Sequence, residues 1–417
     1  MTIYKHDISN CFVGKICKSD FDDICKSGEK IISDIKRKKE NCELPLLSIV
    51  EDSGDLVEIE SIAKQINEKF STLVVLGTGG STLNPQMMLA VKPHAKTEVK
   101  FIDHVDPYDM KVFFSNIDPH KTAFLAISKS GRTTETIAQI ISCLNWQDKN
   151  KISDKAEHWF FISDPGSNPL RDIAKKTGGK ILDHHPDIGG RFATFSNVSL
   201  LPASVAGIDI RQIRKGASDC IENNLGDDSQ ALKGAAFSFA AIKNGINNNV
   251  LMPYISRMSA FTSWYRQIWA ESLGKEGKGS TLINALGTLD QHSQLQLYLD
   301  GPKDKIFTLI RLENNEKNSS LANEYMKESD FEFFNNANLG DINNASEQAT
   351  FETLAKYGCP VRQISIDRLD EYVMGALAAH SILEVLIMAE FLKVSAFGQP
   401  AVEAGKILMK DILNKVK

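Results

Sequence analysis

The sequence predicts an α/β protein made of two α/β sandwich domains in tandem, closed by long C-terminal helices. The chain has 417 residues, enough for two or three domains at roughly 100–200 residues each. Short apolar runs recur in two series with helical stretches between them, which is typical of parallel sheets covered by helices. Hydrophobic residues make up 42% and charged residues 24%, close to globular usage, so wholesale disorder is excluded.

The predicted elements follow in chain order. Residues 1–43 are charged and lysine-rich with apolar residues at helical spacing, so we expect helices that pack onto a core formed elsewhere. A first domain at 44–208 has predicted strands at 72–76, 99–102, 123–127, 159–162 and 180–182. A second domain at 209–417 has predicted strands at 250–255, 281–286, 306–312 and 361–366.

The region before the last strand divides into a predicted loop and a predicted helix. The stretch from Glu313 to Asn344 is rich in Asn and Ser, so we expect a loop there. Ala345 to Tyr357 has the pattern of a helix that ends at Gly358, with Pro360 unable to continue it. Two long helices then close the chain.

Charge, cysteine usage and hydropathy limit the partners and the compartment. Lys+Arg 48 against Asp+Glu 53 gives a net charge of −5, which disfavours a nucleic-acid or anionic-membrane surface. The seven cysteines never form C-x-x-C, so neither a disulfide framework nor a zinc site is indicated, and a cytoplasmic location fits. No secretory signal is expected, and the apolar stretch 375–392 carries His380, Glu384 and Glu390, which predicts a buried core helix rather than a membrane span.

A glycine turn follows the first predicted strand. It reads LGTGGST from Leu76 to Thr82, and its backbone N–H groups lie close together where a helix begins, so the turn can cradle an anion. Thr82 occupies the third glycine position of G-x-G-x-x-G, so a dinucleotide site is only weakly indicated, and a merely tight turn is as good an interpretation.

A loop rich in hydroxyl groups follows the third predicted strand. It reads SKSGRTTET from Ser128 to Thr136 and contains Lys129, Ser130 and Thr133. Short hydroxyl donors, exposed N–H groups and positive charge at a helix start are what a phosphate monoester requires. A single Ser or Thr would be read as a helix cap, but the number of hydroxyls here favours phosphate.

Three further motifs carry candidate catalytic groups. Arg191 in GGRF follows two glycines and can stabilise an oxyanion, although a surface arginine is the simpler interpretation. Glu271 in ESLGK ends an aromatic-rich helix, where burial would suit it to general-base work; a solvated glutamate paired with Lys275 is the alternative. His292 in GTLDQHSQLQL is a candidate for a second proton transfer, or a structural histidine.

Two other sites have simpler interpretations. Lys406, at the end of GQPAVEAGK, lies on the last predicted helix and matters only if that helix packs over the cleft. His184 and His185 lack the i, i+4 spacing of metal ligands, so no metal site is predicted.

Taken together and in order, these motifs resemble the glucose-6-phosphate isomerase family. The resemblance extends from about Leu76 to Lys406. It implies two doubly wound sugar-isomerase (SIS) domains, no cofactor, and the interconversion of D-glucose 6-phosphate and D-fructose 6-phosphate through a cis-enediol(ate).

The resemblance also implies roles for individual residues. Glu271 would move a proton between C2 and C1, Arg191 would stabilise the intermediate, and Gln399 would contact the substrate. His292 and Lys406 would take part in ring opening. The phosphate would be held by a group of residues from the first two motifs: Gly80, Ser81, Ser128, Lys129, Ser130 and Thr133.

In this family the equivalent histidine comes from the neighbouring subunit, so a homodimer with shared active sites is implied. Three alternatives remain: a bifunctional phosphoglucose/phosphomannose isomerase, which the ESLGK and DQHSQ segments disfavour, a non-catalytic phosphosugar sensor, and a dinucleotide-dependent enzyme. Comparable turnover of mannose 6-phosphate and fructose 6-phosphate would favour the first of these.

Overall fold

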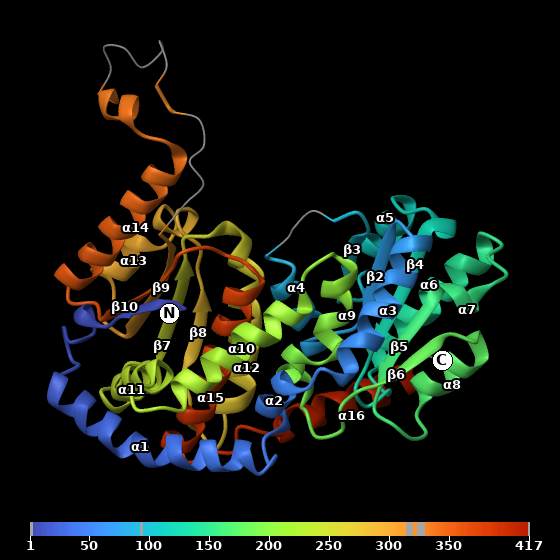
Figure 1. The fold of residues 1–417 in the computed structure, drawn as a ribbon, viewed down its shortest axis with the longest axis horizontal. Helices are drawn as coiled ribbons and strands as arrows, with labels where there is room; N and C mark the ends of the chain where they lie inside the picture. Colours follow the sequence, from blue (N-terminus) through green and yellow to red (C-terminus); the bar gives the residue numbers. More distant parts are fainter. Residues whose placement is uncertain (1–2, 92–94, 314–319, 323–329, 416–417) are drawn as a thin grey trace.

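The computed structural model describes residues 3–91, 95–313, 320–322 and 330–415 of the chain. These residues contain two five-stranded sheets, which lie side by side along the long axis of the molecule (Figure 1). Helices cover both sheets, so the predicted α/β architecture with parallel sheets is confirmed.

The first sheet is parallel throughout and has the strand order β3-β2-β4-β5-β6. Its strands are β2 (Thr72–Leu76), β3 (Glu98–Ile102), β4 (Thr122–Ile127), β5 (Trp159–Ser163) and β6 (Lys180–Asp183). Every residue of β2, β4 and β5 is buried, which explains why they appear in the sequence as continuous apolar runs. All five strands agree with the predicted positions to within one residue.

Two separate cores cover the two faces of this sheet. Leu73 and Val75 of β2 lie in one core and Val74 and Leu76 in the other, because successive side chains of a strand point to opposite faces. The helices of this half of the chain are α3 (Gly54–Lys69), α4 (Gly80–Met88), α5 (Pro107–Ser115), α6 (Thr134–Lys149), α7 (Lys155–His158), α8 (Pro169–Thr177) and α9 (Asn197–Val205), with the 3₁₀ helix η4 (Gly190–Phe195) before α9.

The second sheet has the strand order β1-β10-β9-β7-β8. Its strands are β1 (Lys5–Asp7), β7 (Asn248–Pro253), β8 (Thr281–Asn284), β9 (Lys305–Leu312) and β10 (Val361–Ile366). Only β1 runs antiparallel, along the edge of β10. Strand β1 was not predicted, because its three charged or polar residues carry no strand pattern.

The other helices are α1 (Lys18–Glu40), α2 (Pro45–Ser48), α10 (Ile210–Asn224), α11 (Gln230–Lys243), α12 (Ser259–Leu273), α13 (Leu295–Asp300), α14 (Leu339–Lys356), α15 (Glu371–Leu392) and α16 (Glu403–Lys415). Most of them surround the second sheet, whereas α16 extends toward the half of the molecule that holds the first sheet (Figure 1). The predicted N-terminal helix is α1, whose Phe21 and Ile24 share a core with Phe237 of α11. In the described part of the chain, α15 alone is long and apolar enough to span a membrane, and 94% of its apolar window is buried, so it is the predicted core helix.

The prediction of a loop from Glu313 to Asn344 is wrong at its end. Helix α14 begins at Leu339 rather than at Ala345, because Asn338 forms a capping box with Asp341. The Asn338 side chain accepts from the Asp341 N–H, and the Asp341 carboxylate accepts from the Asn338 N–H at 2.9 Å. A short 3₁₀ turn occupies Glu332–Asn336, and residues 314–319 and 323–329 lie outside the described residues.

Candidate active site

The first sheet has its topological switch point between β2 and β4. The connection after β2 leads to β3 on one side, and the connection after β4 leads to β5 on the other. Ligands of open α/β sheets bind at the carboxyl ends of the strands at such a point. Because β2 and β4 are paired neighbours, the glycine turn and the hydroxyl loop meet there, as phosphate binding would require.

The hydroxyl loop lies against the start of a long helix. The buried Ser128 Oγ lies 3.0 Å from the Thr133 Oγ1, and α6 begins at the next residue, Thr134. Ser130 is exposed, and its Oγ accepts from the Arg132 N–H at 3.3 Å. The N–H groups of the first turn of a 16-residue helix therefore face the same region as these hydroxyls, an arrangement that favours an anion.

Lys129 makes contacts that the sequence did not suggest. Its ammonium donates to the carbonyl of Pro186 at 2.6 Å and to that of Ile188 at 2.8 Å. These bonds hold the segment that leads into Gly189. Participation of Lys129 in phosphate binding stays a prediction, and in this structure its side chain fixes the loop before Arg191.

The GGRF segment lies directly against the glycine turn. Gly79 has φ 58°, a conformation that favours glycine, and α4 begins at Gly80. A Cβ atom on Gly80 would lie 2.3 Å from the carbonyl oxygen of Gly190, so only glycine allows the two backbones to approach this closely. The turn thereby places Arg191 beside the carboxyl end of β2.

Arg191 is a buried side chain with five hydrogen bonds. Nε donates to the Ser272 Oγ at 2.9 Å, and Nη1 donates to the Glu271 Oε2 at 3.3 Å and to the Gln399 Oε1 at 2.7 Å. Nη2 donates to the carbonyls of Ala396 at 2.6 Å and Gly398 at 3.2 Å. Burial lowers the pKa of Arg191, and the Glu271 carboxylate opposes that shift. The simpler interpretation of Arg191 as a surface arginine is therefore wrong.

Glu271 has a second partner that its motif did not indicate. Gln267, one turn earlier on α12, donates from Nε2 to the Glu271 Oε1 at 3.0 Å. The same Nε2 lies close to the glycine turn, 2.9 Å from where a Cβ of Gly79 would be. The i, i+4 spacing of Gln267 and Glu271 on a predicted helix was the available signal.

The hydrogen-bond partners of Lys275 are backbone carbonyls, and the alternative in which Lys275 pairs with Glu271 is wrong. Its ammonium donates to the carbonyls of Ser395 at 2.5 Å and Phe397 at 2.8 Å. Burial and then the charge of Arg191 lower the pKa of Lys275. Lys275 and Arg191 thus bind alternate carbonyls of the segment that leads to Gln399, and this brings Gln399 into the site.

Among the described residues, His292 is not one of the hydrogen-bond or ion-pair partners of Glu271. His292 is exposed and follows a 3₁₀ turn, η6 (Leu289–Gln291). The turn is held by Asp290, which accepts from the Leu286 N–H at 2.7 Å, the Ser293 Oγ at 2.6 Å and the Gln294 Nε2 at 2.9 Å. Burial raises the pKa of Asp290, but these hydrogen bonds outweigh it and leave the pKa low. Asp290 is therefore a structural residue of the turn.

The polar partner of Lys406 is neither Arg191 nor Glu271. It is exposed on α16, and its ammonium forms an ion pair with the Glu403 Oε1 at 2.7 Å. Among the described residues of α16, none is buried. A role of Lys406 in ring opening stays a prediction.

Within the described ranges, no group of three or more His, Cys, Asp or Glu side chains is placed to hold a metal ion. His184 is buried, with Nδ1 2.9 Å from the His185 carbonyl oxygen. Burial lowers its pKa to about 4.

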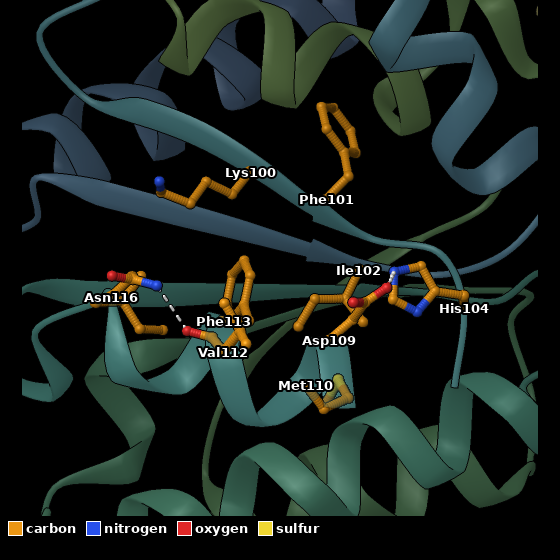
Figure 2. A pocket seen from close by; sticks show the side chains of 10 residues that line it. Lys100, Phe101, Ile102, His104, Asp109, Met110, Val112, Phe113 and Asn116 are labelled. Atoms are coloured by element: carbon orange, nitrogen blue, oxygen red, sulfur yellow. Dashed lines mark hydrogen bonds and ion pairs between the residues drawn. The ribbon is translucent and has the colours of Figure 1, made fainter. Parts of the chain in front are cut away.

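A separate pocket of about 330 Å³ lies at the outer edge of the first sheet, between β3 and α5 (Figure 2). Its polar groups include Lys100, Asn116 and His104, whose Nε2 is 3.7 Å from an Asp109 oxygen. The Asn116 amide is already bonded to the carbonyl of Val112 at 2.8 Å. None of the predicted site residues lines this pocket.

The fold and the site define an α/β protein of the phosphosugar-isomerase type, in which a switch point rich in hydroxyls faces a buried arginine and a glutamate. The family model for phosphoglucose isomerase matches residues 51–417, so the chain belongs to that family. Relatives named glucose-6-phosphate isomerase include one from Carboxydothermus hydrogenoformans, 31% identical over 94% of this chain and 89% of its own length. Another, from Thermus thermophilus, is 31% identical over 91% of this chain and 92% of its own.

Solved structures agree with the fold. A hypothetical protein from Thermus thermophilus superposes with a TM-score of 0.90 at 29% identity, covering 98% of this chain and 99% of the other. A glucose-6-phosphate isomerase from Chlamydia trachomatis has a TM-score of 0.75 at 22% identity, covering 86% of this chain and 72% of the other.

Proposed function

We infer that the chain catalyses the reversible conversion of D-glucose 6-phosphate to D-fructose 6-phosphate, the activity of the family to which it belongs. The observation that carries this inference is the buried guanidinium of Arg191, 3.3 Å from the Glu271 carboxylate and beside the glycine turn. Isomerisation of an aldose to a ketose requires a base for a proton α to a carbonyl and a fixed cation for the enediolate that forms.

We propose that Glu271 moves the proton between C2 and C1. Its side chain is 33% exposed, whereas that of Arg191 is 3% exposed. The carboxylate can thus reach a substrate while the guanidinium stays fixed by Ser272 and the 396–399 backbone. A cation held in place before the reaction stabilises developing charge without having to reorganise. When Glu271 accepts the proton, its carboxylate becomes neutral. The Arg191 guanidinium then pairs with the negatively charged oxygen of the cis-enediolate.

The phosphate of the substrate binds, in this proposal, at the start of α6. Ser128, Ser130 and Thr133 supply hydroxyls, and the Gly80 N–H and the Ser81 hydroxyl complete the site. The phosphate is remote from C1 and C2. Its binding fixes the open-chain form of the sugar so that C2 lies near Glu271, and the binding energy is used to orient the substrate. No cofactor takes part in this chemistry.

We further propose that the chain acts as a homodimer in which His292 reaches the site of the partner subunit. His292 is exposed and is flanked by the exposed apolar side chains of Leu289 (67%) and Leu297 (50%). Helix α16 exposes Ile407, Leu408, Ile412 and Leu413 along its length. Exposed apolar side chains at these two places fit a subunit interface better than a solvated surface.

We also propose a domain division, a location and a substrate preference. The two sheets fit two SIS domains, at 44–208 and 209–417, that follow an N-terminal segment at 1–43.

All seven cysteines are free thiols, which supports a location in the cytoplasm. Glucose 6-phosphate is proposed as the substrate in preference to mannose 6-phosphate, and comparable rates with both sugars would contradict that choice.

Proton exchange tests the reaction. The wild-type chain is incubated with glucose 6-phosphate in D₂O, and NMR follows deuterium at C2 together with the appearance of fructose 6-phosphate. We expect both signals from the wild type, and we expect Glu271→Gln to lower kcat by roughly 10²–10⁴-fold with a much smaller change in KM. A wild-type chain that binds the sugar phosphate with neither exchange at C2 nor isomerisation is a sensor and not an isomerase.

Subunit complementation tests the shared site. Glu271→Gln and His292→Gln are each purified, mixed, unfolded and refolded together. If Glu271 and His292 of one site come from different subunits, each mixed dimer has one intact site, and roughly one quarter of wild-type activity returns. Activity that stays at the level of the separate variants would show that both residues act within one chain, or that the chain does not dimerise.

A further inference from the structure

One buried side chain links the glycine turn, the GGRF segment and helix α12. Asn84 lies on α4, one turn after Gly80, and its exposed fraction is 0%. It follows the glycine turn by two residues, in the sequence Leu83-Asn84-Pro85, and the sequence suggested no role for it.

The amide of Asn84 makes four hydrogen bonds. Nδ2 donates to the carbonyls of Gly80 at 2.5 Å and Gly190 at 2.9 Å. Oδ1 accepts from the Thr194 Oγ1 and from the Trp264 Nε1, both at 2.8 Å. A primary amide has two N–H donors and two lone pairs on its oxygen, so the side chain has no unused hydrogen-bonding capacity.

Each partner belongs to a segment that carries a group of the site. Gly190 directly precedes Arg191, and Thr194 lies one turn further along the same 3₁₀ helix, η4. Trp264 precedes Glu271 by seven residues, two turns of α12, so the two side chains lie on the same side of that helix. Gly80 opens the helix next to the proposed phosphate site.

We propose that Asn84 is a positioning residue that sets the distance between the phosphate-binding turn and the pair formed by Arg191 and Glu271. This inference rests on the proposed function. Asn84 acts through the Gly190 carbonyl and the Trp264 indole and does not contact the substrate. It holds Arg191 and Glu271 at the place that C1 and C2 of the substrate occupy when the phosphate is bound at the start of α6. A displacement of about 1 Å at such a site lowers the rate by about 10²-fold.

The test is Asn84→Asp in the full-length chain. The aspartate keeps the shape and the oxygen that accepts from Thr194 and Trp264, but its second oxygen faces the Gly80 and Gly190 carbonyls without a proton to donate. We expect kcat to fall by about 10–100-fold and KM for fructose 6-phosphate to change by less than about threefold, because the phosphate-binding hydroxyls of Ser128, Ser130 and Thr133 make no hydrogen bond with Asn84. The matched control is Thr194→Val, which removes one bond to Asn84 and leaves both carbonyl bonds, and its kcat should fall by less than about threefold.

Hydrogen exchange of the substrate-free chains distinguishes this inference from the proposed function. We expect faster exchange at the amides of the glycine turn and of 189–195 in Asn84→Asp than in Thr194→Val, because the bonds to the Gly80 and Gly190 carbonyls are the ones that Asn84→Asp loses. A folded Asn84→Asp with wild-type kcat and unchanged exchange would overturn the inference. An equal loss of kcat in Thr194→Val would also overturn it, since general packing would then be the cause. If the wild type proves inactive as an isomerase, the proposed function fails, and the exchange comparison still decides whether Asn84 fixes the two segments.

If Asn84→Asp does not fold, Trp264→Phe replaces it in the same assays. That variant keeps an aromatic ring in the core and removes the N–H that bonds to Asn84, so α12 alone loses its link. We expect a loss of kcat with KM retained and faster exchange confined to α12. Wild-type kinetics and exchange in Trp264→Phe would count against a positioning role.

Discussion

The guanidinium of Arg191 lies 3.3 Å from the carboxylate of Glu271, although 80 residues separate them in the chain. The residue after Glu271 also binds the arginine, because the Ser272 Oγ accepts from Arg191 Nε at 2.9 Å. Helix α12 therefore carries two partners of Arg191 at consecutive positions. Glu271 is the candidate base, and Ser272 holds the guanidinium in place. The Arg191 side chain is nearly inaccessible and that of Glu271 is 33% exposed, so the geometry separates a fixed charge from an accessible base.

The first prediction concerns Arg191→Lys. A lysine keeps the positive charge, but a single ammonium cannot replace Nε, Nη1 and Nη2 in five bonds with fixed directions. We expect kcat to fall by about 10²-fold or more, with a smaller effect on KM, in steady-state assays of isomerisation.

Lys275→Met is the matched control for Arg191→Lys. Lys275 binds the Ser395 and Phe397 carbonyls of the same segment but has neither Glu271 nor Ser272 as a hydrogen-bond partner. We expect this variant to increase cleavage of the 395–399 segment in limited proteolysis and to lower kcat less than Arg191→Lys does. Equal losses of kcat would mean that Arg191 acts mainly by anchoring that segment.

The second prediction compares two glycines that face each other. A Cβ on Gly80 would meet the carbonyl oxygen of Gly190 at 2.3 Å, whereas a Cβ on Gly190 would meet nothing within 4 Å. Gly80→Ala should therefore push the GGRF segment away, lower stability by about 1–3 kcal/mol and lower kcat, because Arg191 moves with the segment. Gly190→Ala should keep Tm and kcat near wild type. Thermal unfolding and kinetics of the two variants, measured in parallel, check this, and a tolerated Gly80→Ala would contradict the close approach.

Local patterns were sufficient to predict the parts of the site that lie at strand ends. The glycine turn and the hydroxyl loop follow fully buried strands, and buried parallel strands are visible in a sequence as continuous apolar runs. The short antiparallel β1 has no such pattern, and its place beside β10 depends on a partner far away in the sequence, since Lys5 pairs with Ser365.

The residues that the sequence did not reveal act through tertiary contacts. Asn84 and Gln267 read as ordinary polar residues on helices, and their roles depend on segments that only the fold brings together. Conversely, His292 and Lys406 were identified by motif, yet the chain by itself leaves both exposed. A motif carries no information on the three-dimensional surroundings of its residues, so the roles of His292 and Lys406 stay predictions.

The third prediction concerns Ser128→Ala. The buried Ser128 Oγ is a proposed phosphate donor, and a hydrogen bond to a charged group contributes about 1.5–3 kcal/mol. We therefore expect KM for fructose 6-phosphate and the inhibition constant of inorganic phosphate to rise by about 10-fold or more. Ser142→Ala, which removes an exposed hydroxyl from the same helix α6, is the control and should leave both constants unchanged. An unchanged phosphate inhibition constant in Ser128→Ala would remove Ser128 from the phosphate site.

The fourth prediction concerns the buried imidazole of His184. Burial lowers its pKa to about 4; the hydrogen bond to the His185 carbonyl opposes this, and the charge of Lys129 adds to the lowering. The Asp164 Oδ1 is 3.7 Å from Nδ1, too far for a hydrogen bond that would favour the imidazolium. In the unfolded chain the pKa returns to about 6.5.

Between about pH 4 and pH 6.5, His184 is therefore protonated in the unfolded chain and neutral in the folded chain. The stability that the neutral His184 contributes is fully present above about pH 6.5 and is lost as the pH falls toward about 4, with a slope of at most about 1.4 kcal/mol per pH unit. We expect His184→Gln to flatten the fall of the free energy of unfolding over this range, measured by urea titration at a series of pH values. His120→Gln, a change at an exposed histidine, should keep the wild-type slope. If His184→Gln keeps that slope as well, other groups cause the acid sensitivity, because only the loss of a buried neutral imidazole distinguishes the two variants.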